Sequence, residues 1–366
     1  MEPLSRRNFI FGGLAAFGAS TFIPGSKFGA QNVAAGTGII NVHHHLTAPA
    51  YVKFLTDNQV RDFPNKSVVE GLEDMDKAGI STAFTSIIGP GIWFGNIADT
   101  RRLARECNDF AAKLVRDYPG RFGMFGSLPL PDIEGSLKEI EYVLDTLKAD
   151  GIYLFTNFGQ IPLYGDKYLG DPMLAPIYEE LNRRRTIVYT HPKDNYCCRD
   201  LIPGVNGPTI EYGTDTTRAI ASLLYSGTAS KYPNVTFIFS HGGGTMPYLA
   251  GRFLGAVAPY LQDGGVLKPG APEDRPRPTM PKGMLYELKK FYYDTASAEN
   301  PLALGALRKL VPLSQILFGT DFPFGAGAEE HIKNLQASGA LTAQELRTVE
   351  RDNAVKLLPR LRALQQ

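Results

Sequence analysis

Four histidines and one aspartate stand where short apolar runs of this 366-residue chain end. His43 and His45 lie two residues apart, so in an extended strand both side chains point to the same side. His191, His241 and Asp321 each close a later apolar run. His43, His45, His191 and Asp321 would form a site of nitrogen and oxygen ligands suited to Zn²⁺, with Mn²⁺ or Fe²⁺ as alternatives. His241 then remains for proton transfer.

The chain has six histidines, and the other two are expected outside this site. His44 alternates with its neighbours, so it points to the opposite side and is expected to pack there or to support a ligand. His331 lies in a helix after the last apolar run and is expected on the surface. A single histidine at a strand end is more often structural than a ligand, so the metal hypothesis depends on the five residues together.

Eight apolar runs rich in Ile, Val, Phe and Tyr alternate with amphipathic helices, which favours a (β/α)8 barrel of parallel strands. A doubly wound open sheet is the alternative, but it would more naturally carry a glycine-rich phosphate turn after its first strand, where this chain has three histidines. In a barrel the carboxyl ends of all strands meet at one mouth, so the candidate ligands would converge. The predicted strands are Gly38–Val42, Ile80–Ile88, Phe122–Leu128, Gly151–Thr156, Thr186–His191, Val235–His241, Phe291–Ala296 and Gln315–Asp321.

The composition is that of a globular protein, with 43% hydrophobic and 20% charged residues. The 38 basic and 37 acidic residues give a net charge of +1, so there is no basic footprint for nucleic acid. No segment after the first thirty residues has 18 consecutive apolar residues, so no membrane span is expected. We expect one barrel domain over residues 31–366.

Residues 1–30 have the pattern of an export signal. Arg6 and Arg7 stand directly before an apolar stretch, Phe9–Phe22, that is too short and too rich in glycine for a stable membrane span. This resembles a twin-arginine signal and predicts a periplasmic or secreted protein, with Phe28-Gly29-Ala30 as an imperfect cleavage site. A plain membrane anchor or a general secretory signal is the alternative.

Several motifs together resemble the amidohydrolase superfamily, in particular the branch of aminocarboxymuconate-semialdehyde decarboxylase and the metal-dependent benzoate-type decarboxylases. Members like 6-methylsalicylate decarboxylase are the most similar. The resemblance covers about residues 38 to 360. Its motifs are Asn41-Val42-His43-His44-His45, Thr190-His191-Pro192, Ser240-His241-Gly242-Gly243-Gly244, Tyr293-Asp294-Thr295-Ala296 and Gly319-Thr320-Asp321-Phe322-Pro323.

This resemblance implies a role for each matching residue. His43, His45, His191 and Asp321 match the family's metal ligands, and His241 matches the catalytic histidine beside the metal-bound water. In the benzoate decarboxylases the metal-bound aspartate is proposed to deliver the proton, whereas in the muconate enzyme the counterpart of His241 activates water. The sequence does not choose between these routes.

The resemblance also implies a homodimer and one metal ion. Arg252 matches an arginine that reaches the substrate carboxylate of a neighbouring subunit, although a surface arginine or an internal ion pair is an equal alternative. The loop after the first strand offers only Arg61 for a second carboxylate contact, which disfavours the muconate substrate. The fourth predicted strand, 151–156, has no lysine to bridge two metals.

We therefore expect a non-oxidative decarboxylase of a small aromatic or dienoic acid, such as a salicylate-type acid. Trp93 and Phe324 are the aromatic residues predicted to contact the substrate near the barrel mouth. A lactone or ester hydrolase on the same site is the alternative, and an exported binding protein without metal or turnover is the third hypothesis. Cys197 and Cys198 are adjacent, so they are expected to be free thiols.

Overall fold

The computed structural model describes residues 38–60, 63–158, 167–193, 195–198 and 201–363. The predicted export signal, residues 1–30, and Arg61 lie outside the described residues.

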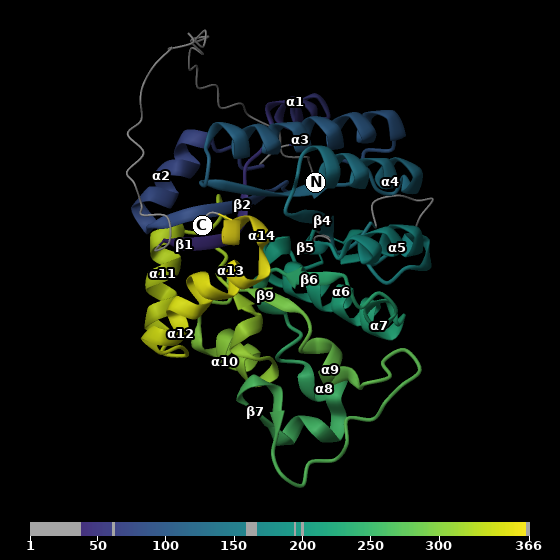
Figure 1. The fold of residues 1–366 in the computed structure, drawn as a ribbon, viewed down its shortest axis with the longest axis vertical. Coiled ribbons are helices and arrows are strands. Elements are labelled where there is room, and N and C mark those ends of the chain that lie inside the picture. Colours follow the sequence, from purple (N-terminus) through teal and green to yellow (C-terminus); the bar gives the residue numbers. More distant parts are fainter. Residues whose placement is uncertain (1–37, 61–62, 159–166, 194, 199–200, 364–366) are drawn as a thin grey trace, which may run out of the picture. The chain divides into compact units, whose positions relative to one another are not determined.

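Eight parallel strands form one sheet in the order β1-β2-β3-β4-β5-β6-β9-β10 (Figure 1). Each predicted apolar run overlaps one of these strands, so the predicted (β/α)8 barrel is confirmed. The first strand is longer than predicted and includes the histidines, because His45 pairs with Ser86 of the second strand. The strands are β1 (Ile39–His45), β2 (Ile80–Ser86), β3 (Phe122–Ser127), β4 (Gly151–Phe155), β5 (Ile187–His191), β6 (Thr236–Phe239), β9 (Tyr292–Asp294) and β10 (Ile316–Leu317).

The segment that follows β10 closes the barrel against β1. The Phe318 carbonyl accepts a hydrogen bond from the Val42 amide at 2.9 Å. Further along, the Asp321 amide donates to the His43 carbonyl at 3.0 Å. The last and the first strand of the barrel therefore meet at the positions that carry two candidate ligands.

Helices surround the strands, and several begin at side-chain caps that can be recognised in the sequence. Ser67 and Glu70 form the capping box at the start of α2, and the Asn300 side chain accepts from two amides at the start of α10. The helices are α1 (Pro49–Asp57), α2 (Val68–Ala78), α3 (Ile97–Asp117), α4 (Ile133–Glu141), α5 (Ala175–Arg184), α6 (Gly213–Tyr225), α7 (Thr228–Lys231), α8 (Ala250–Leu254), α9 (Met284–Leu288), α10 (Pro301–Leu310), α11 (Ala328–Ala337), α12 (Ala343–Arg347), α13 (Asn353–Leu357) and α14 (Pro359–Ala363). A small antiparallel hairpin pairs β7 (Leu261–Gln262) with β8 (Val266–Leu267).

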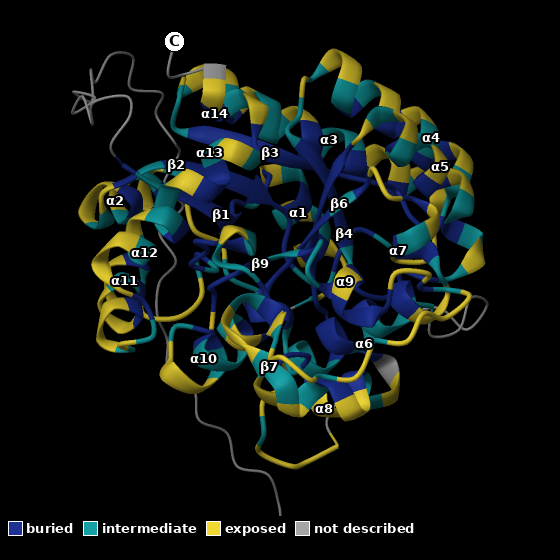
Figure 2. Ribbon diagram, turned by 60° about the horizontal axis from the view of Figure 1, so that its bottom comes forward, coloured by how far each residue is buried: buried dark blue, intermediate teal, exposed yellow. Residues whose placement is uncertain are grey.

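Both faces of the strands are buried, and the outer faces of the helices are exposed (Figure 2). One apolar layer fills the barrel interior and a larger one lies between strands and helices, as parallel sheets require. Interior residues include Ile40, Phe84, Phe125, Tyr189 and Ile238, all at most 2% exposed. The interior is therefore a packed core, and the polar groups that it contains collect at its carboxyl end.

Among the described residues, the structure contains no helix whose length and apolarity would let it cross a membrane.

Candidate metal centre

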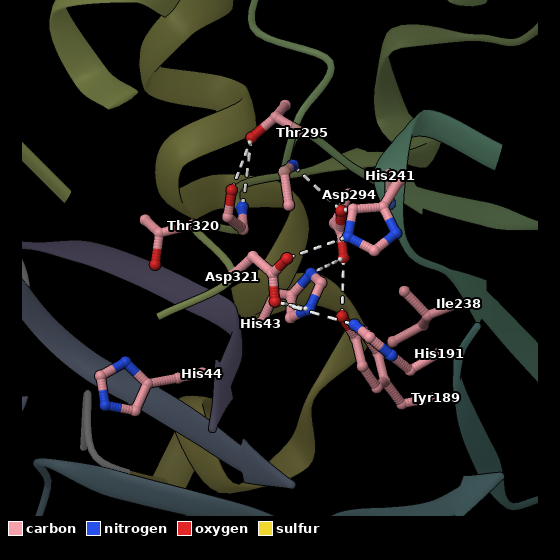
Figure 3. Close-up of polar contacts among 12 residues, drawn as sticks. His43, His44, Tyr189, His191, Ile238, His241, Asp294, Thr295, Thr320 and Asp321 are labelled. Carbon is pink, nitrogen blue, oxygen red and sulfur yellow. Dashed lines mark hydrogen bonds and ion pairs between the residues drawn. The ribbon is translucent and has the colours of Figure 1, made fainter. Parts of the chain in front are cut away.

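The barrel brings together all five residues predicted for the site, and Figure 3 shows four of them, namely His43, His191, His241 and Asp321. His43 and His45 come from β1, and His191 is the last residue of β5. His241 opens the turn that follows β6, and Asp321 lies four residues beyond β10. The convergence confirms that these side chains share one mouth, as expected for strand ends of a barrel.

Asp321 lies at the centre of the cluster. Its Oδ1 is 2.9 Å from Nε2 of His43, 3.2 Å from Nε2 of His45 and 3.7 Å from Nε2 of His191. Its Oδ2 is 3.1 Å from Nε2 of His241. One carboxylate oxygen thus faces three imidazole nitrogens, and the other oxygen faces the fourth.

Second contacts orient the three rings that face Oδ1. Nδ1 of His191 is 2.7 Å from the Pro192 carbonyl, and Nδ1 of His45 is 3.0 Å from the Ser86 hydroxyl. Nδ1 of His43 is 2.9 Å from Oδ2 of Asp294. When Nδ1 donates to such an acceptor, Nε2 keeps its lone pair, which is the usual arrangement of histidines that bind metals.

The donor set fits a divalent cation. One ligand atom from each of His43, His191, His241 and Asp321 lies within 4.8 Å of the others, and Nε2 of His45 is only 3.1 Å from Nε2 of His43. Nε2 of His191 is buried and has no hydrogen-bond partner. Imidazole nitrogens held this close, one of them without a hydrogen-bond partner, are stabilised by a cation or a proton between them.

The two candidate roles differ in their surroundings. The Nδ1 atoms of His45 and His191 have hydrogen-bond partners. Within the described residues, Nδ1 of His43 has no hydrogen bond but lies 2.9 Å from the Asp294 carboxylate, whereas Nδ1 of His241 is buried with neither a hydrogen bond nor an ion pair. It stays a prediction that His43, His45, His191 and Asp321 are the metal ligands and that His241 is the catalytic group. The different surroundings of His241 agree with this prediction.

Charges within the cluster set its protonation. Burial lowers the pKa of His43, but the neighbouring carboxylates of Asp321 and Asp294 outweigh burial and raise the pKa to about 10. Burial raises the pKa of Asp321, yet His43 and the other imidazoles hold the pKa well below its usual range. Burial lowers the pKa of His191 to about 3. The site thus favours positive charge beside its two carboxylates, and a divalent cation would supply such charge.

Asp294 supports the centre, and sequence reasoning gave it no role. It is fully buried at the end of β9 and accepts hydrogen bonds from the His241 amide at 2.9 Å and the Tyr189 hydroxyl at 2.8 Å. It therefore orients His43 through the side chain and His241 through the backbone. Asp294 lies inside the predicted strand Phe291–Ala296, two residues before its end, whereas the observed strand β9 ends at Asp294 itself, so the predicted boundary hid this residue.

The backbone around the centre is tightly constrained. His241 and Asp321 have φ values of 55° and 61°, a region that side-chain-bearing residues rarely adopt. Gly319 leaves no room for a larger residue, because a Cβ atom there would lie 2.8 Å from Cβ of His43 and 2.9 Å from Cβ of Asp294. Rare backbone angles and close packing thus hold His241 and Asp321, whose side chains contact each other.

Aromatic residues surround the mouth. The ring of Phe324 lies 6.2 Å from His45 and is 41% exposed. Trp93 lines a small pocket of about 40 Å³ together with Phe155 and Phe158. Tyr212, which sequence reasoning missed, lies 5.9 Å from the His191 ring and reaches the site from the long loop after β5. Nothing in that loop's sequence shows which of its side chains turns inward.

The positions of His44, His331 and Arg252 can be compared with those expected from the sequence. His44 is buried and stacks on Phe322 with ring centroids 4.4 Å apart, as expected for a packing residue. His331 is not on the surface, because it is 6% exposed and its Nε2 lies 3.1 Å from the Thr295 hydroxyl. Arg252 is exposed on α8, and the protomer does not bring it to the centre.

The expectation of free thiols at Cys197 and Cys198 is wrong, since the structure joins them in a disulfide. The pair lies in a short 3₁₀ turn after β5. The guanidinium of Arg218 lies 3.8 Å from Sγ of Cys198.

Comparisons with known proteins identify the family. The amidohydrolase family model matches residues 40–360. The decarboxylase yanB of Aspergillus niger is 35% identical over 340 residues, which cover 88% of this chain and 87% of that protein. The 6-methylsalicylic acid decarboxylase of Penicillium expansum is 33% identical over 340 residues, covering 89% and 97%.

Solved structures share the fold. An amidohydrolase II superposes with a TM-score of 0.77 at 26% identity, covering 88% of this chain and 99% of that one. A dihydroxybenzoic acid decarboxylase from Polaromonas, with bound manganese and the inhibitor 2-nitroresorcinol, superposes with a TM-score of 0.70 at 23% identity, covering 88% and 96%. With the family model matched over most of the barrel, the chain belongs to the amidohydrolase family.

Proposed function

We propose that this protein is a metal-dependent, non-oxidative decarboxylase of small aromatic carboxylic acids, such as salicylate-type acids. The observation that carries the proposal is the cluster of four imidazoles around Asp321 at the barrel mouth. Relatives named as decarboxylases, more than 30% identical over nearly the whole barrel, support this reaction.

The ligands would be His43, His45, His191 and Asp321. When bound there, a divalent metal holds the carboxylate and an adjacent hydroxyl of the acid and neutralises their charge. The outer contacts of the three histidines fix the ring orientations before substrate arrives, so little reorganisation is needed. We propose Zn²⁺ for this position because three imidazoles and one carboxylate are typical zinc ligands, and Mn²⁺ is the alternative supported by the manganese-bound relative.

The reaction needs one proton. The carbon–carbon bond breaks as CO₂ leaves, and the ring carbon takes a proton in its place. Nε2 of His241 and Oδ2 of Asp321 lie 3.1 Å apart at the centre itself. In this proposal one residue of the pair delivers the proton to the ring carbon.

The test is CO₂ release from a panel of hydroxybenzoates, with metal analysis of the same protein sample. We expect release that depends on bound metal and is lost after chelation. Lactone or ester turnover without CO₂ release would replace this proposal with the hydrolase alternative.

We further propose that the protein forms a homodimer in which Arg252 reaches the partner subunit. Arg252 is exposed on α8, and Tyr248 in the turn before this helix is 85% exposed, so both are accessible to a partner. Light scattering measures the mass in solution, and Arg252→Ala is expected to weaken the substrate carboxylate contact. A monomer with unchanged activity in this variant would contradict the proposal.

We also propose export through the twin-arginine route. This proposal is based on Arg6 and Arg7 and on the apolar stretch Phe9–Phe22 that follows them. Replacing both by Lys in a bacterial host is expected to keep the protein in the cytoplasm. An unchanged distribution between cytoplasm and periplasm would contradict it.

A further inference from the structure

A small cavity of about 80 Å³ borders Asp321, between the loop after β9, the loop after β10 and α11. It is too small for a typical ligand site but has room for several water molecules, since one water needs about 10–15 Å³. Its wall is rich in the polar partners that such water needs. The polar lining includes Ser297, Glu299, Thr320, Asp321, His331 and Asn334.

The cavity reaches from the protein surface to the centre. On its outer side, Glu330 and Asn334 of α11 are exposed. On its inner side, Thr320 is 8% exposed and Asp321 belongs to the cluster of imidazoles. Water in this cavity would therefore lie between the solvent and the central carboxylate.

Glu299 lines the cavity with an unsatisfied oxygen. Its side chain is 23% exposed, but Oε2 is buried and has no hydrogen-bond partner among the described residues. Nδ1 of His331 lies 3.6 Å from this oxygen, which is too far for a hydrogen bond. A buried carboxyl oxygen without a partner is unfavourable, and water in the cavity would satisfy it.

The surroundings of Glu299 favour its protonated form. Burial raises the pKa of Glu299, and the charges of Asp294 and Asp321 add to this increase, whereas His241 opposes it. The carboxyl group therefore keeps its proton to a higher pH than an exposed glutamate does. Such a shift brings it closer to the neutral pH at which a group can both take up and release protons efficiently.

His331 faces Glu299 from α11 and positions it. Burial lowers the pKa of His331 to about 4, so the ring is neutral at neutral pH and does not force Glu299 to ionise. The ring is held in place by Nε2, which lies 3.1 Å from the Thr295 hydroxyl. Glu330, on the exposed side of the same helix, is the other acidic group of α11 at the cavity.

The proposed reaction uses one proton per turnover. The bond between the ring and the carboxylate carbon breaks, its electron pair stays on the ring carbon, and a proton from the His241–Asp321 pair forms the new carbon–hydrogen bond. CO₂ leaves without a proton. The pair must therefore regain one proton from the solvent before the next turnover.

We propose that Glu299 passes protons from the solvent, through water in this cavity, to the His241–Asp321 pair after each turnover. Glu299 does not touch the substrate in this scheme, so it acts as a relay, with His331 as its positioning residue. The inference rests on the proposed decarboxylase function, because that function consumes the proton.

The test follows CO₂ release by metal-loaded, full-length Glu299→Gln after rapid mixing with the hydroxybenzoate that the unmodified protein decarboxylates fastest. Glutamine keeps the shape of the side chain but carries no exchangeable acid proton. The first turnover uses the proton already held by the pair, so we expect it at the rate of the unmodified protein. Later turnovers should be about 100-fold slower, the low end of what one positioned proton-transfer group contributes. CO₂ should thus appear as a burst of about one molecule per site.

A second variant tests the relay by replacing its acid from solution. Glu299→Ala leaves space in the cavity, and formic acid is small enough to enter it. We expect added formate at slightly acidic pH to raise the slow rate of this variant at least about 10-fold, with metal content unchanged. Chloride at the same concentration should have no such effect, and formate should not accelerate the unmodified protein.

Glu350→Gln is the matched control. Glu350 is also a half-buried glutamate whose pKa is raised by burial, but it does not line the cavity. Its neighbour Arg351 donates to the Gly38 carbonyl, just before β1 and at the opposite end of the barrel from the centre. This variant is expected to show the rates of the unmodified protein in the first and later turnovers.

The relay is wrong if Glu299→Gln keeps the steady rate of the unmodified protein, if its first turnover is slowed as much as the later ones, or if formate does not restore Glu299→Ala. Each of these outcomes requires an unmodified protein that releases CO₂, so they leave the proposed function intact. An unmodified protein that releases no CO₂ from any acid refutes the proposed function and, with it, the need for the relay.

Discussion

The two halves of the barrel mouth are built from opposite chemistries. Of the adjacent strands β5, β6, β9, β10 and β1, three end in a histidine or an aspartate, and β6 and β10 are followed within four residues by His241 and Asp321. In contrast, β2, β3 and β4 contain no charged residue. The first half is held by directed contacts between side chains and by unusual backbone angles at His241 and Asp321. The second half is held by packing, as where Gly91 lies so close to Phe155 that a Cβ atom would be 2.8 Å from the ring.

This division separates reaction from recognition. A charged centre must be fixed before substrate arrives, because reorganising charges in a buried site is costly. An apolar pocket gains affinity from area and shape, and substitutions there change its preference without removing the chemistry. The charged half should therefore respond to mutation in metal content and rate, and the apolar half in substrate affinity.

The largest effect is expected for His191→Ala in the charged half. The variant is expected to lose its metal, and CO₂ release should fall to background, because one of the four predicted ligands is gone. Metal analysis and CO₂ release measure both. His331→Gln, which alters a buried histidine outside the centre, should retain metal. Activity that survives in His191→Ala would show that the site assignment is wrong.

The next largest effect is expected in the pH dependence of the free energy of unfolding, through His331, which is buried near the charged half of the mouth. Burial lowers the pKa of His331 to about 4, below the ordinary value of 6.5. The unfolded chain therefore binds the proton more readily, so stability is full above about pH 6.5 and is lost as the pH falls towards 4. The loss should be about 3 kcal/mol. Urea unfolding at pH 7 and pH 4 measures the loss of stability. In His331→Gln this loss should be smaller by about 3 kcal/mol. Equal losses in both proteins would contradict the burial of this ring.

A smaller effect is expected for Asp294→Asn, which keeps the shape but removes the charge beside His43. Metal affinity should fall about 10- to 100-fold, as for other residues that orient a ligand. Competition with a chelator measures it. Asp150→Asn is the control, because this buried carboxylate pairs with Arg360 away from the centre. If both variants bind metal like the unmodified protein, Asp294 has no orienting role.

The smallest effect is expected in the apolar half. Trp93→Ala should raise KM about 10-fold through lost apolar contact, with metal content and kcat little changed. Phe324→Ala, at the more exposed side of the mouth, should raise KM by only about threefold. Steady-state kinetics with metal analysis separate the two quantities. Lost metal in Trp93→Ala would show that the halves are not independent.

Sequence patterns could predict the strands and the central residues because both depend on local signals. Buried parallel strands require continuous apolar runs, and a barrel brings their ends together whatever the loops do. The strand-end rule that found Asp321 missed Asp294, because the predicted strand ran two residues past it, and the contacts of Asp294 with His43 and the His241 amide depend on which strands lie opposite.

The remaining residues depend on information that is not local. Tyr212 lies in a long loop, whose path follows from contacts with the rest of the barrel. His331 was predicted wrongly although a signal existed, because it shares its helix face with Ala328 and Leu335, which are both buried. The Cys197–Cys198 bond depends on a turn geometry that adjacency alone does not reveal.

Barrel closure has a consequence for how the protein matures. His43 is near the start of the described chain, and Asp321 follows its last strand, so the carboxylate is the last of the predicted ligands to leave the ribosome. A nascent or C-terminally truncated chain therefore has three imidazoles and no central carboxylate. Binding of the proposed metal by all four predicted ligands would then require Asp321 in place against β1, and it would tie the free energy of metal binding to barrel closure.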